Sequence, residues 1–69
     1  MTKLKQYRLM QDLTQEKASK LIGVRREDIC RIEKNKQLPR INTIYKMAEV
    51  YKVTPEEIFL ALPRNRYGN

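Results

Sequence analysis

Apolar residues recur at helical spacing along most of the chain, and the breaks between apolar stretches fall at residues that commonly end or begin helices. In the first stretch Leu4, Tyr7 and Leu9 predict an amphipathic helix that ends near Gln11 and Asp12. Aspartate tolerates the left-handed backbone conformation that often closes a helix, which suits it to this corner. No stretch alternates apolar and polar residues as a half-buried strand would, so the pattern predicts an all-α protein.

A glycine separates the second and third apolar stretches. Gly23 can adopt a positive φ and turn the chain sharply between two helices, because glycine has no Cβ. Thr14 is expected to cap the helix before this turn, and the buried face of that helix is expected to carry Ala18, Ser19 and Ile22. The small Ser19 side chain would let the two helices cross closely.

The helix after the turn is expected from about Arg25 to Lys34, with Ile29 and Ile32 as its buried stripe. Together with Ser19 and Gly23, these positions give a small residue, a glycine four residues later, and apolar residues six and nine positions after the glycine. This spacing is typical of a helix-turn-helix.

Two further helices complete the predicted fold. One is expected from about Ile41 to Tyr51, and its residues available for burial are Ile44, Tyr45, Met47, Ala48 and Tyr51. In the last helix Thr54 is the expected cap, Pro55 takes the first helical position and Glu57 completes a capping box. Pro63 would end that helix.

Composition limits what this helical protein can bind or catalyse. The 69 residues suffice for one domain, which we place at residues 3–62, followed by a short C-terminal tail at residues 63–69. The single cysteine, Cys30, excludes a disulfide within one chain, and the lack of histidine argues against a zinc site. We therefore expect helix packing and self-association to stabilise the fold, with no metal and no cofactor.

Catalysis is the least expected class of function. Ser19, the only serine, is expected at a helix crossing, and Cys30 has no candidate base of the usual kind. A glycine-rich phosphate loop, a leader pattern and an apolar run near the length of a membrane span are all absent from the sequence. We therefore expect a soluble cytoplasmic protein that is not an enzyme and has no membrane contact.

The charge balance favours a polyanionic partner. Fifteen Lys and Arg residues against eight Asp and Glu residues give a formal net charge of +7 at pH 7. A solubilising surface is the alternative explanation. RNA is less favoured than duplex DNA, because the chain lacks the interleaved aromatic residues that stack on single-stranded bases.

Five segments, in order, resemble the Cro and phage-repressor-like helix-turn-helix regulators, also called the xenobiotic-response-element family. They are "LKQYR", "LTQEKASKLIGV", "ICRIEKNK", "LPRINTIYKMAEVYKV" and "TPEEIF", and they extend from Leu4 to Phe59. The resemblance implies a compact five-helix, lambda-repressor-like domain that binds double-stranded DNA, commonly as a two-fold dimer.

The resemblance also implies roles for the start of the third helix, the end that enters the major groove. Arg26, and Arg31 one turn further along, would read bases, because arginine forms bidentate pairs with guanine. Arg25 would read a base or contact a phosphate. Glu27 has two expected roles that do not exclude each other: it could accept from a cytosine amino group, or pair with Arg31 four residues later.

Residues around the third helix would contact the phosphate backbone, which supplies affinity without sequence information. This implied set is Gln15, Arg25, Asn35, Lys36, Arg40 and Arg8. Gln15 matches a position where a side-chain amide and a helix N-terminus meet a phosphate. Arg8 and Glu33 match a pair that bridges the first and third helices and that can also aim Arg8 toward a phosphate. A solvated surface is the alternative for Gln15 and for the loop residues.

The last helix bears on assembly, because "IFLAL" puts apolar side chains on every side of a two-turn helix. Ile58 and Phe59 would serve the core, which leaves Leu60 and Leu62, together with Tyr67, for the interface of a homodimer. In the alternative, Leu62 and Tyr67 fold back over the first helix.

The expected function is that of a sequence-specific transcriptional regulator, most simply a repressor that binds an inverted-repeat operator as a homodimer. The alternative is an antitoxin that binds a toxin protein and also regulates its own operon.

Three positions depart from the usual family pattern. Arg25 stands where Ser or Thr commonly caps the third helix, so Glu27 and Asp28 in the first turn would have to offset the helix dipole. Asn35 and Lys52 stand where glycine is common. Cys30 lies near the DNA-facing side of the helix, where it is either silent or a redox switch.

Overall fold

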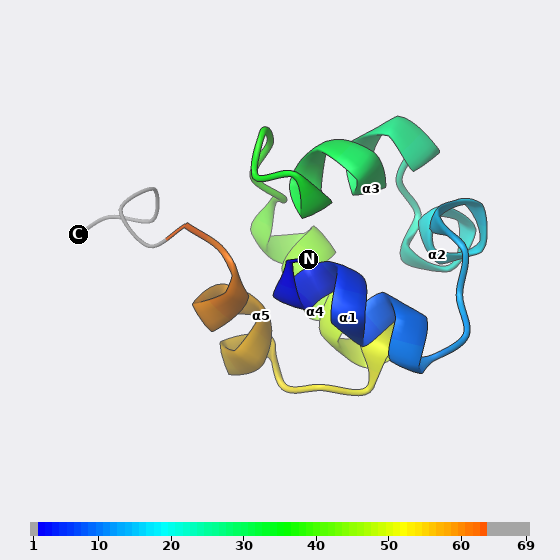
Figure 1. Ribbon diagram of the computed structural model, residues 1–69. Helices are drawn as coiled ribbons and strands as arrows, with labels where there is room; N and C mark the ends of the chain where they lie inside the picture. Colours follow the sequence, from blue (N-terminus) through cyan, green and yellow to red (C-terminus); the bar gives the residue numbers. More distant parts are fainter. Residues whose placement is uncertain (1, 64–69) are drawn as a thin grey trace.

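The fold consists of five α-helices and, within the residues that the structure describes, no strand (Figure 1). The computed structural model describes residues 2–63. The helices are α1 (Lys3–Met10), α2 (Gln15–Ile22), α3 (Arg26–Glu33), α4 (Ile41–Tyr51) and α5 (Pro55–Ala61). The predicted all-α, five-helix fold is confirmed, and no helix in this part of the chain is long and apolar enough to cross a membrane.

Side-chain caps start three of the helices. Thr14 and Thr54 accept hydrogen bonds from the backbone N–H groups of Lys17 and Glu57, both at 3.1 Å, as the sequence predicted. The Glu57 carboxylate accepts in return from the backbone N–H of Thr54 at 2.9 Å, which completes the predicted capping box. Thr2 caps α1 in the same way.

After each of the first four helices, one residue adopts the left-handed backbone conformation and turns the chain. Asp12, Asn35 and Lys52 have φ angles of 57°, 59° and 60°, and Gly23 has a φ of 91°. Asp12 and Gly23 were expected at such corners. Asn35 and Lys52 adopt the left-handed conformation without the freedom that glycine would give, so both turns carry a local conformational cost.

One hydrophobic core joins all five helices. Its buried members are Leu4, Ala18, Ile22, Ile29, Ile32, Ile44, Met47, Ala48, Tyr51, Ile58 and Leu62. Because α4 packs against α1, α2 and α5, it forms the centre of the domain. In Figure 1, α3 lies at the top of the molecule, across α1 and α4 from α5. The helix-turn-helix and the last helix are therefore separated by α1 and α4.

Two expectations about burial were wrong. Leu62, expected to stay available to another subunit, is only 4% exposed and completes the core. The chain leaves α5 at this residue in an extended conformation, and the Leu62 side chain packs in the buried core. Tyr45, expected to be available for burial, is 57% exposed. Tyr67, the third residue expected at a dimer interface, lies outside the described residues.

Candidate nucleic-acid interface

The turn between α2 and α3 is built from backbone hydrogen bonds to one carbonyl. The N–H groups of Gly23 and Val24 both donate to the carbonyl of Ser19, at 2.8 and 3.0 Å. Ser19 is buried, and its hydroxyl donates back to the Glu16 carbonyl at 2.6 Å, so this polar side chain is satisfied at the helix crossing. The turn fixes α3 relative to α2, as the motif predicted.

The two faces of α3 differ sharply. Ile29, Ile32 and Glu33 are buried against the rest of the domain. Arg26, Glu27 and Arg31 are exposed, and no hydrogen bond or ion pair of the described residues involves their side chains. Glu27 and Arg31 form no ion pair in this structure, and base contact by Glu27 stays a prediction. The exposed side chains of α3 are free to meet a ligand.

Asp28 supplies the cap that the N-terminus of α3 otherwise lacks. Arg25 precedes the helix without a side-chain capping hydrogen bond, but its backbone N–H donates to Asp28 Oδ2 at 3.1 Å. Gln37 Nε2 donates to the other carboxylate oxygen, Oδ1, at 3.0 Å. The expected support of the helix N-terminus by Asp28 is confirmed. The link from Asp28 to Gln37 was missed, because nothing in the local sequence indicates it.

These contacts also change the acidity of Asp28. The hydrogen bond from Gln37, followed by that from the Arg25 backbone, holds the pKa of Asp28 below its ordinary value of 3.8. The carboxylate therefore stays charged at neutral pH and ties the start of α3 to the loop that precedes α4. Arg25 Nε lies 3.5 Å from the same carboxylate, but the Arg25 side chain is 75% exposed, so this ion pair contributes little.

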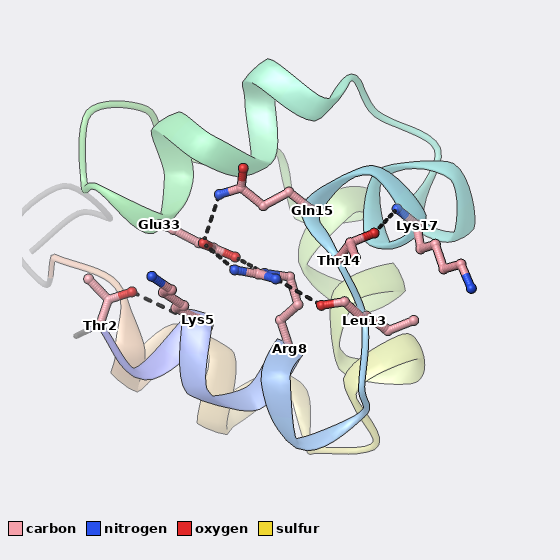
Figure 2. A network of polar contacts seen from close by, with 8 residues as sticks. All are labelled: Thr2, Lys5, Arg8, Leu13, Thr14, Gln15, Lys17 and Glu33. Atoms are coloured by element: carbon pink, nitrogen blue, oxygen red, sulfur yellow. Dashed lines mark hydrogen bonds and ion pairs between the residues drawn. The ribbon is translucent and has the colours of Figure 1, made fainter.

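A buried network holds the other end of α3 (Figure 2). Arg8 Nε and Glu33 Oε2 are 2.6 Å apart, and each side chain is only 6% exposed. Arg8 also donates from its terminal nitrogens to Glu33 Oε1 and to the carbonyl of Leu13, at 3.2 and 2.8 Å. Gln15 Nε2 donates to Glu33 Oε1 at 3.2 Å. The network connects α1, α2 and α3, and the expected bridge between Arg8 and Glu33 is confirmed.

The same network affects two of the expected phosphate contacts. A phosphate contact by Arg8 would have to use the small part of its side chain that remains exposed, so bridging is the role that the geometry supports. Gln15, at the first position of α2, is half-buried with its amide oriented by Glu33. Both phosphate contacts stay predictions.

Basic and polar side chains surround the exposed face of α3. Asn35, Lys36 and Arg40 are exposed in the segment between α3 and α4, and Arg25 is exposed at the other end of the helix. Gln37 and Arg40 line an open groove with Arg25 and Asp28, at the junction of this segment with the turn. The structure thus brings Arg25 and Arg40 together at the N-terminal end of α3, while Asn35 and Lys36 follow its C-terminal end.

Removing one member of the buried ion pair should be costly. Glu33→Gln leaves the Arg8 charge unpaired, and we expect the free energy of unfolding to fall by about 3–5 kcal/mol. The double variant Arg8→Met/Glu33→Leu should lose less, because it removes both buried charges. Urea unfolding followed by circular dichroism would measure both losses, and a loss in the double variant as large as that of Glu33→Gln or larger would contradict the assignment.

The contribution of Asp28 should depend on pH. A lowered pKa in the folded state means that the carboxylate stabilises the fold above its ordinary value of 3.8, and that this contribution disappears as the pH falls through the folded-state pKa. Asp28→Ala should therefore cost about 1 kcal/mol at neutral pH and less at pH ~3. Glu27→Ala, in the same helical turn, serves as a matched control. An equal cost of Asp28→Ala at both pH values would show that its charge is not involved.

Sequence similarity to known proteins agrees with the helix-turn-helix that α2 and α3 form. The sequence profile of a helix-turn-helix family matches residues 4–58. An uncharacterised HTH-type transcriptional regulator of Archaeoglobus fulgidus is 41% identical over 59 residues, which cover 86% of this chain and 83% of that protein. Another, from Methanocaldococcus jannaschii, is 43% identical over 58 residues, covering 84% and 88% respectively. No solved structure matches the chain. The chain belongs to the xenobiotic-response-element family of helix-turn-helix proteins, and is a DNA-binding transcriptional regulator.

Proposed function

We propose that this protein is a repressor that binds an inverted-repeat operator in double-stranded DNA as a homodimer. The exposed face of α3 carries the proposal, because the side chains of Arg26, Glu27 and Arg31 are exposed and form no hydrogen bond or ion pair with the described part of the domain. Hydrogen bonds of Asp28 and Glu33 hold the two ends of α3. Exposed side chains without polar partners on such a helix are suited to contact another molecule. The relatives named above are described as HTH-type transcriptional regulators.

The chemistry of this face fits base edges in the major groove. Arg26 and Arg31 each offer a planar guanidinium that forms two parallel hydrogen bonds with O6 and N7 of guanine. Glu27 offers a carboxylate that accepts from the amino group of cytosine. A correct bidentate pair contributes about 1–3 kcal/mol of discrimination against a wrong base. We therefore assign base reading to these three residues, with Arg25 either joining them or contacting a phosphate.

Contacts to the phosphate backbone of DNA would come from polar residues around α3. The proposed set is Gln15 at the start of α2, Arg25 just before α3, Asn35 and Lys36 just after α3, and Arg40 just before α4. Phosphate contacts fix the orientation of the domain on DNA and supply most of the salt-dependent affinity. Gln15 is well placed for this role, because the N-terminus of α2 favours an anion.

Dimerisation is proposed through α5. Leu60 is 66% exposed on this helix and lies beside the half-buried Phe59. A two-fold dimer would place two copies of α3 about one turn of DNA apart, ~34 Å, and would match an inverted repeat. A repressor needs only to occupy its operator, so no activity beyond tight binding is required.

Selection of bound duplexes from a random pool would test the proposal. We expect an enriched inverted repeat whose half-site centres are ~10 bp apart. Each copy of α3 would then enter the major groove on the same side of the DNA duplex. Salt-sensitive binding without enrichment would contradict sequence-specific regulation. It would direct attention to a protein partner, such as the toxin expected for an antitoxin.

Two substitutions should separate base reading from backbone contact on the selected site. Arg31→Ala should relax the preference for one base pair, with a loss of about 1–3 kcal/mol on the preferred sequence. Lys36→Ala should weaken binding to all sequences about equally and reduce the salt slope by ~1. Competition assays with single-base variants at several salt concentrations would measure both effects, and identical behaviour of the two variants would contradict the division.

A further inference from the structure

A second basic surface lies beside α3, between its C-terminal end and the start of α1. An open groove of about 420 Å³ runs there. Its lining residues are Thr2, Lys5, Gln15, Cys30, Glu33, Lys34 and Lys36. Three helices and the segment after α3 therefore contribute to one groove, and Lys5 and Lys34 are cations beyond those proposed above to contact phosphates.

The charges of this groove are unbalanced. Lys5, Lys34 and Lys36 are exposed, and none of them has an ion-pair partner among the described residues. Glu33 is the acidic residue of the lining, but both of its carboxylate oxygens already accept from Arg8, and Oε1 also accepts from Gln15. The groove thus presents three free ammonium groups and no free carboxylate, which suits an extended anion.

The groove is continuous with the proposed DNA-binding face. Gln15 and Lys36 belong both to the groove lining and to the proposed phosphate contacts, and Cys30 lies on α3 between Arg26 and Lys34. Figure 2 shows Lys5 on the side of α1 that faces Glu33 and Gln15. A DNA strand that contacts Gln15 and Lys36 would continue along the groove toward the N-terminal end of α1.

We propose that this groove binds the phosphodiester backbone of DNA beyond the base pairs that α3 contacts, with Lys5 and Lys34 as additional phosphate ligands. The proposal rests on the DNA-binding function proposed above and enlarges its contact surface to α1. Ammonium groups act as point charges toward phosphates, so these contacts would add affinity and salt dependence without sequence preference. One domain would then contact a longer stretch of DNA than the half-site whose bases α3 contacts.

Lys5→Gln and Lys3→Gln form a matched pair for the test. Both remove one positive charge from the first turn of α1, but Lys3 lines a different groove, between α1 and α5. The cap of α1 is retained in Lys5→Gln, because Thr2 accepts from the backbone N–H of residue 5. A difference in DNA affinity between the two variants therefore reflects where the positive charge was removed. It does not reflect the loss of one charge as such, because both variants lose one.

The affinity of each variant for the selected duplex would be measured as a function of salt concentration. Each phosphate contact contributes about 0.9 to the slope of log K against log salt, so Lys5→Gln should flatten the slope by about 0.9. Between 50 and 200 mM salt, the wild-type protein should lose about threefold more affinity than this variant. Lys3→Gln should keep the wild-type slope.

Phosphate ethylation interference would locate the contact. Ethylation of a phosphate outside the base-contacted half-site should weaken the wild-type protein and Lys3→Gln, but not Lys5→Gln. Equal slopes and equal interference patterns for the two variants would overturn the proposal and leave the function intact. Failure of the wild-type protein to select any duplex would instead reject the proposed function itself.

Discussion

The buried ion pair between Arg8 and Glu33 is the constraint on which the DNA-facing side of this domain depends. Neither charge can be buried without the other, because an unpaired ion in the protein interior costs several kcal/mol. Their hydrogen bonds therefore hold α1, α2 and the C-terminal end of α3 in one arrangement. The apolar core alone would resist separation of these helices, but it has no comparable directional contact to set their orientation.

The opposite end of α3 is held by a different device. Asp28 connects the helix start to Gln37, so the segment between α3 and α4 is attached to the helix that it follows. Charged hydrogen bonds at both ends give α3 a defined position, while the side chains between them on the outer face remain unengaged. The inner face of this short helix therefore packs against the domain, and its outer face is available to bind a ligand.

Local sequence rules were sufficient for most of the fold. Caps at Thr14 and Thr54, the corner at Gly23 and the buried stripe of α3 follow from spacing within a few residues, and all were predicted. The errors concern Tyr45 and Leu62, whose burial depends on how α4 and α5 pack and on the direction in which the chain leaves α5. The contact between Asp28 and Gln37 likewise joins residues nine positions apart through a loop, beyond the reach of helical periodicity. The roles of individual site residues depend on DNA itself, which neither the sequence pattern nor the isolated chain contains.

The independence of the outer face of α3 has an evolutionary consequence. The side chains of Arg26, Glu27 and Arg31 are exposed and form no hydrogen bond or ion pair with the rest of the described domain, so replacing them should leave folding nearly unaffected. Mutations there can accumulate without compensating changes elsewhere, whereas Arg8, Asp28 and Glu33 are bound to their partners. A duplicated gene could therefore acquire a new target by drifting through a handful of outward-facing codons, while the scaffold is inherited unchanged.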